Sequence, residues 1–145
     1  KNLYLYYTDT GVSGLEFKNR KIKAQKNDDH FLVRQVHTQL KEYLEGKRKK
    51  FDCPLDITGT DFQMKAWKTL MKIPFGQAIS YGEQAEKMDR PGGARAVGNA
   101  NGKNPIPIII PCHRVVGANG SLTGYAGGLG VKEVLLNLES GRLTF

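Results

Sequence analysis

The sequence is short of cysteine, of acidic residues and of long apolar runs, and each shortage argues against a class of protein. Only 2 of its 145 residues are cysteines and no secretory leader is evident, so we expect reduced thiols rather than a disulfide scaffold. No apolar run approaches the roughly 20 residues of a membrane-spanning helix. The histidines, His30, His37 and His113, are scattered without zinc-type spacing. We therefore expect no metal, no other cofactor and no membrane partner.

The shortage of acidic residues leaves the chain strongly basic. Lys and Arg number 22 against 14 for Asp and Glu, a formal net charge of +8. Residues 1–60 hold 12 basic and 8 acidic groups and residues 61–145 hold 10 and 6, so the surplus is spread rather than gathered in a tail. Such an excess favours a polyanionic partner, above all nucleic acid. We expect a globular, monomeric, intracellular protein, cytoplasmic or, in a eukaryote, nuclear.

Residues 1–57 predict a small α/β domain. A β-hairpin is indicated by two extended stretches and the turn residues between them, at 3–7, 15–22 and 8–14. Apolar residues then recur at helical spacing over 31–44, and Gly46 ends the pattern. Residues 51–59 are typical of an extended linker.

Residues 58–145 predict a mostly α-helical domain. Helices are expected after the N-cap Thr60, over 81–88 after the N-cap Ser80, over about 93–101, and over about 130–139. The two short helices in the middle, joined by a tight glycine-containing turn, indicate a helix-turn-helix of the winged-helix-like kind.

The third of these helices is poor in side chains that could identify bases. Arg95 and Asn99 are its only long polar residues, and the neighbours Ala94 and Ala96 are small. A helix that recognises a base sequence usually presents several long side chains that donate or accept hydrogen bonds at the base edges. Small residues instead allow a close approach to a narrow surface, where one arginine could enter an opened duplex from the minor groove. A packed helix with one exposed arginine explains the pattern equally well.

Cys112 and His113 follow a stiff segment, 104–111, that contains three prolines and cannot be helical. A buried cysteine is most often a small hydrophobic residue. A thiolate nucleophile is the alternative; it would need a base such as His113, and that base would need a carboxylate. Of the six acidic residues after residue 60, five fall on predicted exposed faces, which leaves Glu139. From these residues alone both interpretations stay open.

The motif around Cys112 resembles a known active site. Ile-Pro-Cys-His-Arg-Val-Val at 110–116 is similar to the signature of the O6-alkylguanine-DNA alkyltransferases, also called methylated-DNA–protein-cysteine methyltransferases. The likeness extends upstream through Arg-Ala-Val-Gly at 95–98 and Asn-Pro-Ile-Pro at 104–107, and downstream to Glu139. It covers nearly all of 58–140, whereas residues 1–57 agree only in their strand and helix character.

The resemblance implies roles in the reaction for the residues that match the family's active site. Cys112 would accept the alkyl group, His113 would act on its thiol through a water molecule, and Glu139 would orient His113. Tyr81 would contact the phosphate beside the target and donate a hydrogen bond to the departing guanine. Asn104 would brace the active-site segment.

The resemblance also implies the DNA contacts and the pocket. Arg95 would replace the flipped nucleotide in the stack, with Ala94 and Ala96 beside it on the DNA-binding helix. Tyr125 would help to wall the pocket. The carbonyls of Cys112 and Val115 would accept from the guanine amino group, with the Ala126 amide near O6. Asn101 and Ala118 depart from the family at positions that shape the pocket, and the zinc ligands of some relatives are missing.

The function implied by the resemblance is direct repair of double-stranded DNA containing O6-alkylguanine or O4-alkylthymine. The alkyl group would move irreversibly to Cys112, once per molecule, because a thioether has no hydrolysable carbonyl and no resolving cysteine is evident. A non-catalytic lesion sensor is the main alternative, although such proteins lack the acceptor cysteine. A cysteine hydrolase and a transcriptional helix-turn-helix module are further alternatives.

Overall fold

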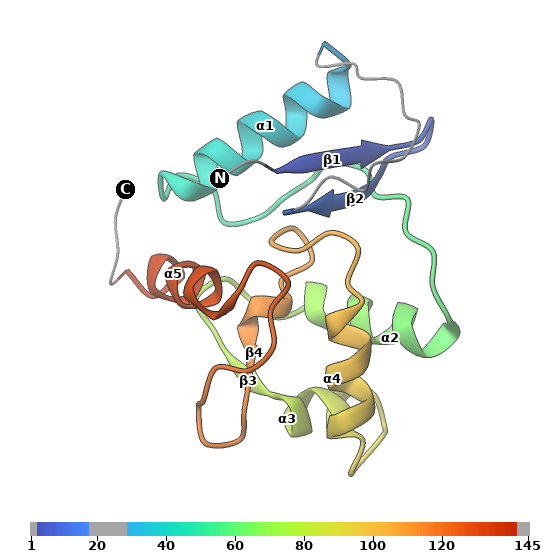
Figure 1. Cartoon of the computed structure of the whole chain (residues 1–145), viewed down its shortest axis with the longest axis vertical. Coiled ribbons are helices and arrows are strands. Elements are labelled where there is room, and N and C mark those ends of the chain that lie inside the picture. The colour runs from blue at the N-terminus through green and yellow to red at the C-terminus, as the bar shows by residue number, and fades with distance from the viewer. Residues whose placement is uncertain (1–2, 18–28, 142–145) are drawn as a thin grey trace.

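The computed structural model describes residues 3–17 and 29–141, which form an α/β unit and a mostly helical unit (Figure 1). The α/β unit consists of β1 (Tyr4–Tyr7), β2 (Val12–Glu16) and α1 (Phe31–Leu44). The helical unit consists, in chain order, of α2 (Asp61–Met71), β3 (Ile79–Ser80), α3 (Tyr81–Lys87), α4 (Ala94–Gly102), the 3-10 turn η1 (Cys112–Arg114), β4 (Val115–Val116) and α5 (Leu129–Glu139). The predicted fold class is confirmed. No helix among the described residues is long and apolar enough to cross a membrane.

The N-terminal hairpin forms, but its second strand begins earlier than predicted. β2 starts at Val12 and pairs antiparallel with β1. On its other side the Val12 N–H donates to the Pro54 carbonyl at 2.8 Å, and the Val12 carbonyl accepts from the Asp56 N–H at 2.7 Å. A Cβ on Gly11 would lie 2.8 Å from the Pro54 oxygen, so this close approach requires glycine. Because Val12 is hydrogen-bonded on both sides, residues 12–14, which were predicted as part of the turn, belong to the strand. The predicted strand residues 18–22 lie outside the described part of the chain.

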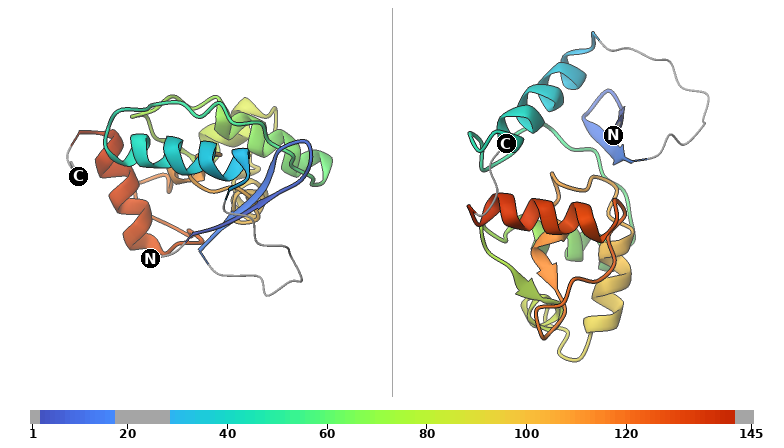
Figure 2. Two further views of the ribbon diagram at one scale, coloured as in Figure 1. Left: turned by 90° about the horizontal axis from the view of Figure 1, so that it is seen from above. Right: turned by 60° about the vertical axis from the view of Figure 1, so that its left-hand side comes forward.

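The first helix, α1, begins and ends close to the predicted residues. The His30 side chain caps it by accepting from the Leu32 N–H at 3.2 Å. Gly46 follows the helix with a φ of +77°, in the left-handed region that favours glycine. Leu32, Val36 and Tyr43 are buried along one face. Through this face α1 packs against the rest of the molecule, and its C-terminal end lies next to α5 (Figures 1 and 2).

The predicted helix-turn-helix is present as α3 and α4, with α2 packed against both. Both predicted N-caps are confirmed: Thr60 and Ser80 each accept from the amide three residues further on and complete a capping box. A buried amide pair joins the two helices of the motif. Gln84 of α3 and Asn101 of α4 exchange hydrogen bonds of 3.1 and 2.8 Å. This pair fixes the position of α4 on α3.

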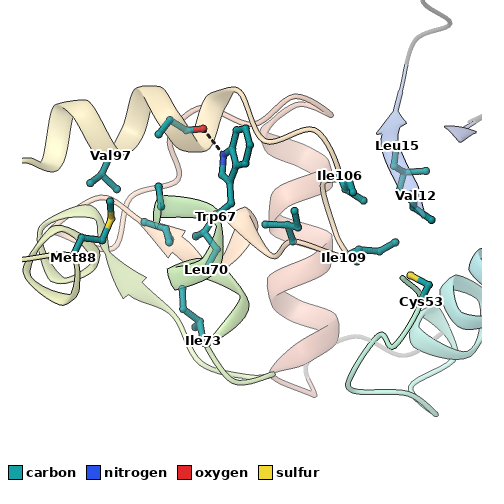
Figure 3. Packing of buried hydrophobic residues seen from close by; sticks show 14 of the residues in the cluster. Val12, Leu15, Cys53, Trp67, Leu70, Ile73, Met88, Val97, Ile106 and Ile109 are labelled. Carbon is teal, nitrogen blue, oxygen red and sulfur yellow. Dashed lines mark hydrogen bonds between the residues drawn. The ribbon is translucent and has the colours of Figure 1, made fainter. Parts of the chain in front are cut away.

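One hydrophobic core crosses from the α/β unit to the helical unit (Figure 3). Trp67 of α2 lies at its centre and donates from Nε1 to the Ala100 carbonyl at 2.9 Å. Val12, Leu15 and Cys53 come from the N-terminal side of this core. Cys53, the second cysteine of the chain, is thus a core residue, and burial raises its pKa. The shared core positions the N-terminal hairpin against the segment that leads to Cys112.

A short parallel sheet that the sequence did not indicate completes the helical unit. β3 pairs with β4, with Ile79 opposite Val115 and Ser80 opposite Val116. Strands of two residues are too short to show an alternating pattern in the sequence. The sheet holds the N-terminus of α3 next to the segment that carries Cys112.

Candidate active site

The segment before Cys112 is held by the side chain of Asn104. Its Oδ1 accepts from the Ile106 N–H at 2.9 Å and its Nδ2 donates to the Ile110 carbonyl at 2.7 Å. Ile108, between them, has a φ of +76°, a conformation that β-branched residues rarely adopt. The amide of Cys112 then donates to the Ile110 carbonyl at 2.8 Å. These contacts are the bracing expected of Asn104, and they fix the backbone that presents the thiol.

Cys112 lines a pocket of about 240 Å³ at the junction of α3, α4 and the loop before α5. The lining residues are Tyr81, Gly98, Asn101, Gly102, Asn104, Pro107, Cys112, Gly124, Tyr125 and Ala126. Five of the predicted site residues therefore meet in one cavity. Asn101 also lines the cavity, although its amide is engaged by Gln84.

Val115, whose carbonyl was expected to accept from the guanine amino group, lies outside that lining. It is fully buried, and its carbonyl accepts from Nζ of Lys132 at 2.7 Å. The same ammonium group donates to the Thr123 carbonyl at 2.8 Å. Lys132 therefore ties β4 to the loop that carries Tyr125 and Ala126.

The thiol of Cys112 is un-ionised at neutral pH in the resting protein. Burial raises its pKa above the ordinary value, and the Asn104 side chain and the positive charge of Lys132 offset only part of that increase. A thiol in this state is a weak nucleophile until a base removes its proton. The site therefore requires a base close to Cys112.

His113 has one nitrogen occupied and one free for that task. Its Nε2 lies 2.6 Å from Oε2 of Glu139, and both side chains are buried. Its Nδ1 is buried and makes no hydrogen bond to the described protein atoms. Burial lowers the pKa of His113, and the attraction of Glu139 restores only part of it. The imidazole is thus neutral, with its proton on Nε2 toward Glu139 and a lone pair on Nδ1.

Glu139 is ionised, because the hydrogen bonds that it accepts lower its pKa by more than burial raises it. Burial alone would raise the pKa of this carboxyl group, but hydrogen bonds from His113 and Arg114 lower it to about 2. Arg114 donates from Nε to Oε1 at 2.7 Å and from Nη2 to Oε2 at 3.0 Å. The Gly76 N–H donates to Oε1 at 3.2 Å, and the Tyr43 hydroxyl donates to Oε2 at 2.5 Å. The predicted partner of His113 is therefore present, in a larger network than expected.

Sequence reasoning missed two of the side chains in this network. Arg114 follows His113 directly, and its conspicuous place next to the predicted base was the available signal. Tyr43 lies 96 residues from Glu139, on a helix of the other unit, and no motif marks it. A contact of that kind depends on how the two units pack.

The remaining predicted residues lie on the two helices of the helix-turn-helix, Tyr81 at the start of α3 and the others at the start of α4. The Tyr81 hydroxyl accepts from the Thr123 hydroxyl at 3.0 Å. Arg95 and Ala96 are exposed on the first turn of α4, and Ala94 is half-buried beside them. The same helix supplies Gly98, Asn101 and Gly102 to the pocket. Arg95 thus lies on the helix that supplies part of the pocket lining, but it is not itself among the lining residues.

Comparison with known families assigns both units. Residues 61–141 match the family described as 6-O-methylguanine DNA methyltransferase, DNA binding domain, and residues 2–57 match the ribonuclease-like domain of the same methyltransferase. The chain belongs to the 6-O-methylguanine DNA methyltransferase family. Its fold is accordingly the ribonuclease-like α/β domain followed by the helical DNA-binding domain of that family.

Named relatives of this methyltransferase family agree. The methylated-DNA–protein-cysteine methyltransferase of Methanosarcina mazei is 53% identical over 141 residues, which cover 93% of this chain and 88% of that protein. The Mycobacterium tuberculosis protein of the same name is 57% identical over 104 residues, covering 72% of this chain. That match spans 63% of the length of the mycobacterial relative.

Solved structures of the family share the whole architecture. The Mycobacterium tuberculosis OGT crystallised in complex with DNA is similar with a TM-score of 0.83 and 44% identity, covering 98% of this chain and 88% of that one. An O6-methylguanine DNA methyltransferase from Methanococcus jannaschii is similar with a TM-score of 0.76 and 27% identity, covering 99% of this chain and 89% of that one.

Proposed function

We propose that this protein repairs alkylated DNA by transferring the alkyl group from O6 of guanine to Sγ of Cys112. The observation that carries the proposal is a pocket lined by Cys112 with the buried His113–Glu139 pair next to it in the chain, in a protein that belongs to the methyltransferase family. O4-alkylthymine presents the same kind of oxygen-bound alkyl carbon and is a second substrate.

The reaction is a displacement at the alkyl carbon. The lone pair on Nδ1 of His113 accepts the thiol proton, through a water molecule, and Glu139 stabilises the imidazolium that forms. The sulfur then bonds to the alkyl carbon as the bond from that carbon to O6 breaks. Guanine leaves with the electron pair and takes up a proton. Hydrogen bonds to the departing base, including one from Tyr81 at the pocket, make it a better leaving group.

The product is a thioether on Cys112, which ends the activity of that molecule. A thioether offers no carbonyl to water, and the second thiol, Cys53, lies in the hydrophobic core. We therefore propose one turnover per protein.

The partner is double-stranded DNA, bound by residues 58–145 with the helix-turn-helix in the minor groove. The net charge of +8 supplies phosphate attraction that depends little on sequence and weakens with salt. The target nucleotide must leave the duplex to reach the pocket, at a cost of a few kcal/mol. Exposed Arg95, with Ala94 and Ala96 beside it, fits the space that the nucleotide leaves in the stack. The protein acts as a monomer in the compartment that holds the DNA, cytoplasm or nucleus.

The decisive experiment is intact-protein mass spectrometry with peptide mapping after incubation with an oligonucleotide that carries O6-methylguanine. We expect one added methyl group on Cys112, saturating at one per protein. Cys112→Ala is expected to bind the DNA and gain no mass. A methyl group on Cys53 would overturn the site assignment, and unchanged mass with intact binding would favour the lesion sensor.

The role of Arg95 is tested by comparing two substrates. Arg95→Ala is expected to slow transfer from duplex DNA more than transfer from free O6-benzylguanine, because only the duplex requires a nucleotide to be extruded. Arg34→Ala removes the same charge from an exposed position on α1 and serves as the control. Equal losses on both substrates for Arg95→Ala would contradict the proposed finger.

A further inference from the structure

Tyr43 connects the α/β unit to the centre of the active site. The residue lies in the last turn of α1 and is fully buried. Its ring packs 5.4 Å from that of Phe51 and edge-on, 6.0 Å, from that of Phe75. Its hydroxyl donates to Oε2 of Glu139 at 2.5 Å. A buried tyrosine that packs against two aromatic rings and is held at its hydroxyl has a fixed orientation.

The hydrogen bond from Tyr43 falls on the oxygen that also holds His113. Oε2 of Glu139 lies 2.6 Å from Nε2 of His113 and 3.0 Å from Nη2 of Arg114. The other oxygen accepts from Arg114 and from the Gly76 amide. Each added donor spreads the carboxylate charge and makes the carboxylate a weaker base toward its other partners. Among the described residues, Tyr43 is the donor to Glu139 that comes from the α/β unit.

We propose that Tyr43 is a positioning residue of the active site, whose hydroxyl holds Glu139 and thereby limits how strongly Glu139 draws a proton onto His113. Without that hydroxyl the carboxylate binds the imidazolium more tightly. His113 then keeps its extra proton to a higher pH, and a protonated His113 has no lone pair for the Cys112 thiol. The N-terminal domain therefore takes part in setting the pH range over which the acceptor thiol is activated.

The other charged and titratable groups around His113 and Glu139 do not replace the effect of the Tyr43 hydroxyl on Glu139. Arg114 and Lys132 face His113 and oppose its protonation, and Tyr125 and Cys112 face the same region as neutral groups in the resting state. Tyr43 remains a donor throughout, because burial and the Glu139 carboxylate hold its pKa well above the ordinary value. Its hydrogen bond therefore persists at every pH at which the protein is assayed.

The test uses two replacements of Tyr43 with opposite expected effects. Tyr43→Phe removes the donor and keeps the ring. Site-specific incorporation of 3-fluorotyrosine at position 43 strengthens the hydroxyl as a hydrogen-bond donor. Because the ring hardly changes in shape, we expect the protein to fold as before. Tyr7→Phe makes the same chemical change in β1, where the ring stacks on His30, and serves as the control.

Two readouts are measured on the full chain. The first is the NMR titration of the His113 ring nitrogens, which needs no substrate. The second is the rate constant of alkyl transfer between pH 5 and 9, which rests on the proposed function. For Tyr43→Phe we expect the His113 midpoint and the acidic limb of the rate profile to rise together by about one pH unit, the scale of one hydrogen bond to a charged group. Fluorotyrosine is expected to lower both, and Tyr7→Phe to change neither.

The outcomes separate this inference from the proposed function. A His113 titration that is the same in the wild type and both Tyr43 proteins overturns the inference, even if the Tyr43→Phe rate falls equally at all pH values. A wild-type protein that never transfers an alkyl group refutes the proposed function, while the NMR titration still decides the role of Tyr43.

Discussion

Replacing Glu139 by Gln should destabilise the folded protein strongly, because the charge of Glu139 is the centre of a buried network. The pKa of Glu139 falls from an ordinary value of 4.5 to about 2 in the folded state. A difference of this size corresponds to a contribution of about 3 kcal/mol to the free energy of unfolding at pH 7. Removing one partner of a buried ion pair costs a similar amount, about 3–5 kcal/mol, because the other charge stays buried. Here the remaining charge is Arg114, which is 6% exposed.

The contribution of Glu139 depends on pH in a defined direction. A carboxyl group whose pKa is lowered by folding stabilises the folded state fully above its unfolded-state pKa, and this stability is lost as the pH falls toward the folded-state value. Glu139 therefore contributes fully above about pH 4.5, and the contribution fades between about pH 4.5 and 2. At pH 3.5 about 1.4 kcal/mol of it should already be gone.

Urea unfolding, followed by the fluorescence of the single tryptophan, Trp67, measures this difference. Wild type and Glu139→Gln are compared at pH 7, 4.5 and 3.5. Glu133→Gln makes the same change at an exposed position of α5, where we expect an effect within about 0.5 kcal/mol. A loss below about 1 kcal/mol for Glu139→Gln at pH 7, or a loss that does not shrink toward pH 3.5, would refute the account of this network.

Three further changes test the helical unit by urea unfolding. Thr60→Ala removes the N-cap of α2 and should lower the free energy of unfolding by about 1 kcal/mol. An unchanged free energy would show that the capping box does not stabilise the helix. Gln84→Leu should lower the free energy of unfolding by about 1–3 kcal/mol, because the buried Asn101 amide is left without its partner, and adding Asn101→Leu should recover part of that loss. If the effects of the two substitutions are strictly additive in the double-mutant cycle, the two side chains do not stabilise each other as described. Trp67→Phe should cost at least about 1 kcal/mol, measured by circular dichroism, because the buried Ala100 carbonyl keeps the Lys103 N–H but loses its second donor, the indole N–H; a smaller loss would contradict the contribution of that bond.

Local features of the molecule were predictable from the sequence because they depend on nearby residues. The helix caps Thr60 and Ser80 act on amides three positions away. The three prolines of segment 104–111 exclude a helix wherever the segment lies. Glu139 could be selected as the partner of His113 because few acidic residues follow residue 60. The elements that were missed or misplaced depend on segments distant in the chain: β3 pairs with β4, and the early start of β2 at Val12 is fixed by Pro54 and Asp56.

The sequence by itself thus determined the helices, the helix-turn-helix and the presence of a cysteine and a histidine on a rigid segment. Only the tertiary structure decided the electrostatics of the site. It placed Tyr43 of the N-terminal domain and the Gly76 amide on Glu139, and it gave the Val115 carbonyl to the ammonium group of Lys132. The physical reason is that a pKa depends on every donor and charge within a few ångströms, and the packing of the two units brings those groups together from positions up to 96 residues apart.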